Sequence, residues 1–135
     1  MKQTFKKEER LTNKKTFDEL FNSGNSISVS PFKILWSEKE GANQTQVGIA
    51  VPKKSFAKAV QRNKLKRRIR EAYRKNKHLL YAFLEKKNLH IALVIIYTER
   101  EELSYQQIEQ KMVVSLQKLI DKMPARGETA RSDWQ

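Results

Sequence analysis

The chain has 135 residues and a mass of 15.9 kDa, which suits one domain with a single hydrophobic core. Its 28 Lys and Arg outnumber its 15 Asp and Glu, so the net charge is +13 and the pI about 10.0. Such a chain is suited to a polyanionic partner, namely nucleic acid, an anionic membrane surface or an acidic protein. The absence of cysteine excludes disulfides, thiolate metal sites and thiol nucleophiles. No apolar run approaches the roughly 20 residues of a membrane span and no signal peptide is visible, so we expect a cytoplasmic protein.

The first part of the chain is predicted to form one helix and a connector. Residues 1–10 are a basic, flexible lead-in, and residues 13–21 are predicted to form a short helix. Apolar side chains recur on one face of that helix at Phe17, Leu20 and Phe21. Residues 23–31 are a polar connector, in which Ile27 and Val29 allow an optional extra strand.

Two strands are predicted next. Residues 32–37 alternate between apolar and polar side chains, and Phe32 and Trp36 are expected to be core residues. The segment 38–44 contains glycine and asparagine and is predicted to be a hairpin loop. Residues 45–51 form the following strand, which has valine and isoleucine on one face and small side chains on the other.

The second half of the chain is predicted to contain two helices around a buried strand. A long basic helix runs from about residue 57 to 87, and a break at 76–78 is left open. Residues 91–97 are β-branched and apolar on both faces, which is typical of a central strand. Residues 104–122 form an amphipathic helix capped by Ser104, with its apolar stripe at Ile108, Met112, Ser115, Leu116 and Leu119. The predicted class is therefore α+β, a single-domain α/β sandwich of order α-β-(β)-β-α-β-α over residues 1–123, followed by a flexible tail at 124–135.

Most of the positive charge lies in one segment. Residues 53–77 hold 12 basic residues and one acidic residue, a net +11, whereas the other 110 residues hold 16 basic and 14 acidic residues, a net +2. Spaced at about 100° per residue, the helix turns Leu65, Ile69 and Ala72 toward the sheet. A neighbouring face of about 140° carries basic and amide side chains, with Lys64, Arg68 and Lys75 on the remaining side. That neighbouring face comprises Arg62, Asn63, Lys66, Arg67, Arg70 and Arg74.

This face is predicted to bind phosphate. Like charges four residues apart, at Arg62, Lys66 and Arg70, destabilise the helix by a few tenths of a kcal/mol each, and no matching row of glutamates offsets them. Arginine binds phosphate oxygens through a bidentate fork, and asparagine donates to phosphate, ribose or a base edge. A membrane partner is less favoured because the apolar face of the helix is committed to the sheet.

A resemblance to a known family rests on this segment. Two stretches of this segment resemble the signature of the bacterial ribonuclease P protein subunit: Lys53-Lys54, and Ala59-Val60-Gln61-Arg62-Asn63-Lys64-Leu65-Lys66-Arg67-Arg68-Ile69-Arg70-Glu71. Lys64 stands where the signature usually has arginine. The helix with Phe17-Asp18-Glu19-Leu20-Phe21 and the strand Val47 to Val51 are also similar to the family. Together these segments extend the resemblance over about residues 10 to 120.

The resemblance implies a function and a set of site residues. The fold would contain a left-handed βαβ crossover, as in a related ribosomal protein domain. Catalysis would belong to the RNA subunit, which uses Mg²⁺ to remove the 5′ leader of precursor tRNA, and the protein would bind no cofactor. One protein would bind one catalytic RNA and help to hold the precursor tRNA. The residues carried over for binding the RNA subunit are Arg62, Asn63, Lys64, Lys66, Arg67, Arg70 and Arg74.

The resemblance also implies a second site, for the single-stranded leader. Phe17 and Phe21 would line a cleft between the first helix and the sheet, with Lys53 and Lys54 beside it. Aromatic faces beside a basic groove are suited to single-stranded RNA, because stacking tolerates any base. Helical spacing by itself favours the alternative that both phenylalanines are ordinary core residues.

The sequence offers little support for catalysis by the protein alone. The acidic pairs Asp18-Glu19 and Glu101-Glu102 are interpreted as solvated surface charge, and His78 and His90 as surface or capping residues. Two alternatives remain open at this point. They are a structural RNA-binding protein, such as a ribosomal protein of related fold, and a protein-only nuclease.

Overall fold

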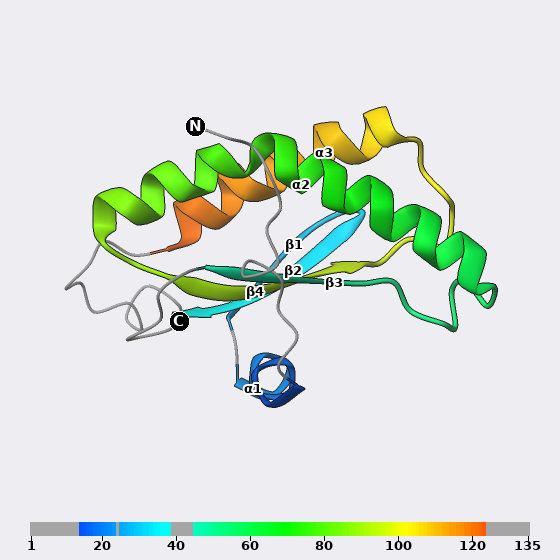
Figure 1. Cartoon of the computed structure of the whole chain (residues 1–135), viewed down its shortest axis with the longest axis horizontal. Helices are drawn as coiled ribbons and strands as arrows, with labels where there is room; N and C mark the ends of the chain where they lie inside the picture. The colour runs from blue at the N-terminus through cyan, green and yellow to red at the C-terminus, as the bar shows by residue number, and fades with distance from the viewer. Residues whose placement is uncertain (1–13, 24, 39–44, 124–135) are drawn as a thin grey trace.

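The computed structural model describes residues 14–23, 25–38 and 45–123 and places three helices against a four-stranded sheet (Figure 1). The predicted α+β class and element order are confirmed, and the optional strand is present as β1. The predictions for residues 1–10 and 124–135 lie outside the described residues. The elements in chain order are α1 (Lys14–Ser23), β1 (Asn25–Val29), β2 (Phe32–Glu38), β3 (Gln46–Ala50), α2 (Ala59–Lys87), β4 (Ile91–Tyr97) and α3 (Tyr105–Lys122).

The sheet has the strand order β1-β2-β4-β3. β4 pairs antiparallel with β2 and parallel with β3, so the predicted central strand is confirmed. The predicted hairpin between β2 and β3 is wrong, because β4 lies between them. The short connection of the sheet instead joins β1 to β2, where Val29 pairs with Phe32. The physical reason is that β4, apolar on both faces, is most fully buried with a partner strand on each side.

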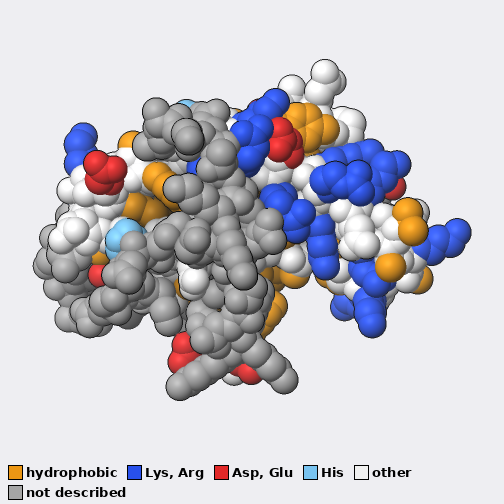
Figure 2. Space-filling view, viewed as in Figure 1, with side chains coloured by type: hydrophobic (Ala, Val, Ile, Leu, Met, Phe, Trp, Pro, Cys, Tyr) orange, Lys and Arg blue, Asp and Glu red, His pale blue; other side chains and the backbone are white. Residues whose placement is uncertain are grey.

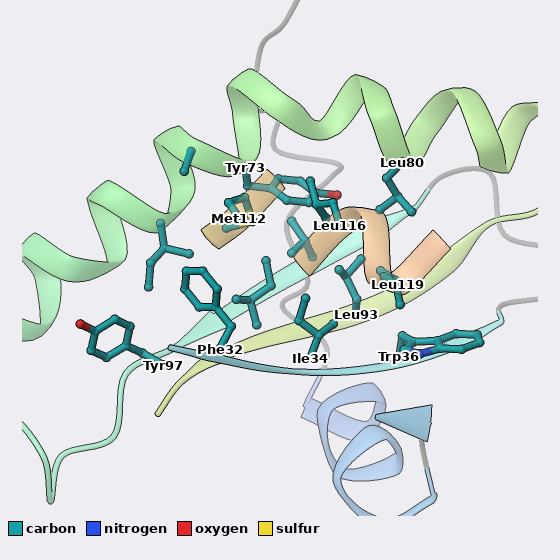
Figure 3. Packing of buried hydrophobic residues seen from close by; sticks show 14 of the residues in the cluster. Phe32, Ile34, Trp36, Tyr73, Leu80, Leu93, Tyr97, Met112, Leu116 and Leu119 are labelled. Atoms are coloured by element: carbon teal, nitrogen blue, oxygen red, sulfur yellow. The ribbon is translucent and has the colours of Figure 1, made fainter. Parts of the chain in front are cut away.

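Helices cover both faces of the sheet (Figure 1). α2 and α3 lie together on one face, where their apolar stripes meet side chains of β2 and β4. Figure 3 shows this main core, and the predicted burial of Phe32 and Trp36 is confirmed. α1 lies on the opposite face, where Leu20 packs on Leu35, Ala92 and Val94.

α2 is one continuous helix of 29 residues, without the break that the sequence left open at 76–78. The Asn76 amide donates to Ala72 O at 2.9 Å and to the Glu109 carboxylate of α3 at 3.2 Å. Lys77 is buried, with its Nζ 5.3 Å from the centre of the Tyr81 ring. Contacts with α3 and within α2 therefore compensate for the weak helix propensity of asparagine. The helix ends at Asn88, which adopts the left-handed conformation (φ 55°).

α3 follows the sequence prediction closely. Ser104 is its N-cap and forms a capping box with Gln107, in which each side chain bonds the backbone N–H of the other residue. All five residues of the predicted stripe are buried. None of the helices among the described residues combines the length and the apolar character needed to cross a membrane.

Candidate nucleic-acid interface

The basic residues gather over the first half of α2 and the turn that precedes it. In Figure 2 they form the blue area at the right, where Figure 1 places the start of this helix. The apolar stripe of α2, which includes Leu65, Ile69 and Ala72, is buried as predicted. The opposite surface of the helix faces solvent.

Four residues of α2 form a surface that we call the free ridge: Asn63, Lys66, Arg67 and Arg70. Asn63, Arg67 and Arg70 are exposed, and Lys66 is half-buried beside them. Within the described part of the chain, none of the four side chains takes part in a hydrogen bond or an ion pair. The three cations of the ridge therefore lie on one helix face without an ion-pair partner among the described residues, and they repel one another. Such a face is suited to an extended anion whose charges repeat along the helix.

The remaining side of α2 carries cations that are already paired. A Glu102 carboxylate oxygen lies 3.3 Å from Lys64 Nζ and 3.3 Å from Arg68 Nη1. Arg68 also donates to Leu103 O at 2.6 Å. We call Lys64, Arg68 and Glu102 the paired flank. Lys75 lies on the same side, with its Nζ 5.6 Å from the centre of the Tyr105 ring.

Arg74 is paired as well. Its Nε and Nη2 donate to the two carboxylate oxygens of Glu71 at 2.9 and 2.7 Å. This bidentate contact holds the pKa of Glu71 below its ordinary value. The sequence shows no matching row of glutamates along the basic face, but single glutamates pair with three of the cations of α2: Lys64, Arg68 and Arg74. Their partners were missed because Glu102 is 38 residues from Lys64 in the sequence, and because a single Glu71 does not form a row.

Arg62 connects the helix to the turn before it. Its Nη1 donates to Phe56 O at 2.9 Å and to Ala57 O at 2.8 Å. Phe56 is buried against the Tyr97 ring, with the ring centres 5.9 Å apart. Lys53 and Lys54 are exposed in the same turn, directly after β3. Arg62 therefore holds the turn with these two lysines against the start of the free ridge.

The structure describes the side chain of one of the two phenylalanines of the predicted leader site. Phe21 is 55% exposed on α1, while its neighbour Leu20 is 1% exposed, so the alternative that Phe21 is a core residue is wrong. The Phe17 side chain lies outside the described residues. Ala50 and Ile96 are partly buried beside the α1 cluster. The cleft itself stays a prediction.

The loop from β4 to α3 positions the paired flank. The buried Tyr97 hydroxyl donates to Glu101 O and accepts from Leu103 N at 3.2 Å. Burial raises the pKa of Tyr97 above its ordinary value of 10.0. The backbone is thus held on both sides of Glu102, and Ser104 then begins α3. The sequence analysis did not single out this anchor; the signal that could have found it is a tyrosine at the end of an otherwise aliphatic strand.

Acidic residues and histidines do not assemble into a metal site in the described ranges 14–23, 25–38 and 45–123. No group of three or more His, Asp or Glu side chains there could hold a metal ion. Asp18, Glu19, Glu101 and His78 are exposed, as the sequence predicted. Glu102 is also exposed, and in addition it is ion-paired with Lys64 and Arg68.

Comparison with known proteins decides the family. The family model described as Ribonuclease P matches residues 5–120. The chain belongs to the ribonuclease P protein family. A relative from Porphyromonas gingivalis, the ribonuclease P protein component, is 31% identical over 122 residues that cover 88% of each chain. The ribonuclease P protein component of Thermotoga petrophila is 39% identical over 80 residues, which cover 59% of this chain and 67% of that protein.

Solved structures of ribonuclease P proteins share the fold. The protein from Thermotoga maritima superposes with a TM-score of 0.65 at 28% identity, covering 82% of this chain and 96% of that chain. The Staphylococcus aureus protein also gives a TM-score of 0.65, at 23% identity, over 83% and 97% of the two chains. The ribonuclease P fold predicted from the basic motif is confirmed. The left-handedness of the β3-α2-β4 crossover stays a prediction.

Proposed function

We propose that this member of the ribonuclease P family is the subunit that binds a catalytic RNA and holds the 5′ leader of precursor tRNA. The free ridge carries the proposal, because its cations form no ion pair in the described part of the chain. A folded RNA presents phosphates at a spacing that several such side chains can contact together. Arg62, Lys64 and Arg74 belong to the same motif by resemblance, but their described contacts are within the protein.

The leader is assigned to the opposite face of the sheet. Phe21 exposes an aromatic face on α1, and Lys53 and Lys54 are exposed at the end of β3. A base stacked on an aromatic ring contributes about 1–3 kcal/mol and does so for any sequence. This is the chemistry needed to hold leaders of different sequence. Phe17 joins this site by resemblance.

Hydrolysis is assigned to the RNA subunit and the Mg²⁺ that it binds. In this proposal the protein contributes binding: it screens phosphate repulsion between catalytic RNA and substrate and restricts the leader. One protein per RNA is expected, acting in the cytoplasm. The result would be accurate removal of the leader at Mg²⁺ concentrations too low for the RNA alone.

The test is reconstitution with a bacterial catalytic RNA. Cleavage of a precursor tRNA is measured at low Mg²⁺ with and without the protein, and we expect the protein to stimulate removal of the leader. Cleavage no faster than with RNA alone would refute the proposal. Crosslinking from position 21 distinguishes the ribosomal alternative: contacts to the leader support the proposal, whereas contacts to ribosomal RNA alone contradict it. Cleavage by the protein without any RNA subunit would instead indicate a protein nuclease.

A further inference from the structure

The paired flank has an arrangement that protein stability alone does not explain. Its three side chains remain partly exposed, at 49% for Lys64, 24% for Arg68 and 29% for Glu102. Ion pairs at such positions contribute about 0–1 kcal/mol to folding. These ion pairs do change the local charge, because the Glu102 carboxylate lies within 3.3 Å of two cations of the most basic segment and lowers the positive potential on this side of α2.

The backbone on both sides of Glu102 is held in place. Tyr97 bonds the backbone of Glu101 and of Leu103, the residues on either side of Glu102. Arg68 donates to the Leu103 carbonyl in addition to its contact with Glu102. Glu102 is thus presented to α2 by a loop anchored to the core. The neighbouring Glu101 offers a contrast, since it is exposed and forms no ion pair among the described residues.

We propose that Glu102 is a specificity-determining residue, which keeps the paired flank neutralised so that RNA phosphates bind only along the free ridge. The inference rests on the proposed function of that ridge. A helix with cations all around would accept an RNA backbone in several orientations, because phosphate contacts carry no sequence information. When the paired flank is neutralised, the free ridge is the cationic surface of α2 left for the RNA phosphate backbone. Arg68 is held back by the Leu103 carbonyl and its side chain is only 24% exposed, against 49% for Lys64, so Lys64 is the main cation that Glu102 withholds from RNA.

The test compares E102Q with E101Q, which raises the net charge by the same amount without breaking an ion pair. Association constants are measured between 50 and 400 mM salt for a bacterial catalytic RNA and for a duplex RNA of random sequence. We expect E102Q to steepen the log–log salt dependence for the duplex by about 0.7–0.9, the value of one added phosphate contact. At 0.1 M salt, this corresponds to about five- to eightfold tighter duplex binding. The ratio of catalytic RNA to duplex affinity should fall, and E101Q should match the wild type in slope.

A double variant assigns the effect to one cation. In K64Q/E102Q the released cation is absent, so the salt slope should return to the wild-type value. Equal slopes for E102Q and E101Q would overturn the inference, as would a double variant that keeps the steep slope. These outcomes are separable from failure of the proposed function, in which the wild-type protein itself would neither bind nor stimulate the catalytic RNA.

Discussion

The substitution Arg67→Ala tests the free ridge most directly. Arg67 is exposed, and no described residue pairs with it, so its charge is available to a phosphate. One phosphate contact changes the log–log slope of affinity against salt by about 0.7–0.9. At 0.1 M salt this amounts to a five- to eightfold loss of affinity, or about 1 kcal/mol, which vanishes toward 1 M. Folding stability should change by less than about 0.5 kcal/mol, because the position is on the surface.

The assay is binding of the catalytic RNA over a salt series, with two comparison variants. Lys118→Ala removes one charge from the exposed face of α3 and should leave the slope unchanged. Lys64→Ala removes a charge already paired with Glu102 and should flatten the slope less than Arg67→Ala. The assignment of the ridge would be refuted if Arg67→Ala weakened binding equally at all salt concentrations. It would also be refuted if the Lys64 variant flattened the slope as much.

Three further substitutions test other parts of the structure. Leu20→Ala should lower the free energy of unfolding in urea by about 2–5 kcal/mol, because it empties a 1% exposed site between α1 and the sheet; a loss below 0.5 kcal/mol would contradict this docking. Phe21→Ala should cost about 1–3 kcal/mol in holoenzyme affinity for precursor tRNA but nothing for tRNA without a leader, and equal losses for both substrates would argue against leader stacking. Tyr97→Phe should destabilise the fold by about 1–3 kcal/mol, since it leaves Leu103 N and Glu101 O without their hydroxyl partner. Burial raises the pKa of Tyr97, so its hydroxyl loses its proton at lower pH in the unfolded chain than in the folded protein. The contribution of this group to the free energy of unfolding should therefore be constant below about pH 10 and fall above it. An equally steep fall in Tyr97→Phe would show that another group is responsible.

Sequence alone determined much about this protein, because its strongest signals are local. The charge of residues 53–77, the apolar stripes of both long helices and the Ser104 cap follow from spacing along the chain. β4 was recognisable because a strand apolar on both faces requires neighbours on both sides. The basic motif identified the family, and the faces of α2 followed from helical geometry.

Only the tertiary structure decided which partners these segments find. Pairing of β2 and β3 with β4 replaced the predicted hairpin, because burial of β4 favours an arrangement that no local signal specifies. The division of the basic helix into a free ridge and a paired flank likewise depended on Glu102, which the Tyr97 anchor brings to Lys64 from 38 residues away. The exposure of Phe21 beside buried Leu20 depended on how α1 lies on the sheet. Charge and periodicity are properties of a segment, whereas pairing and exposure arise from contacts between segments far apart in the chain.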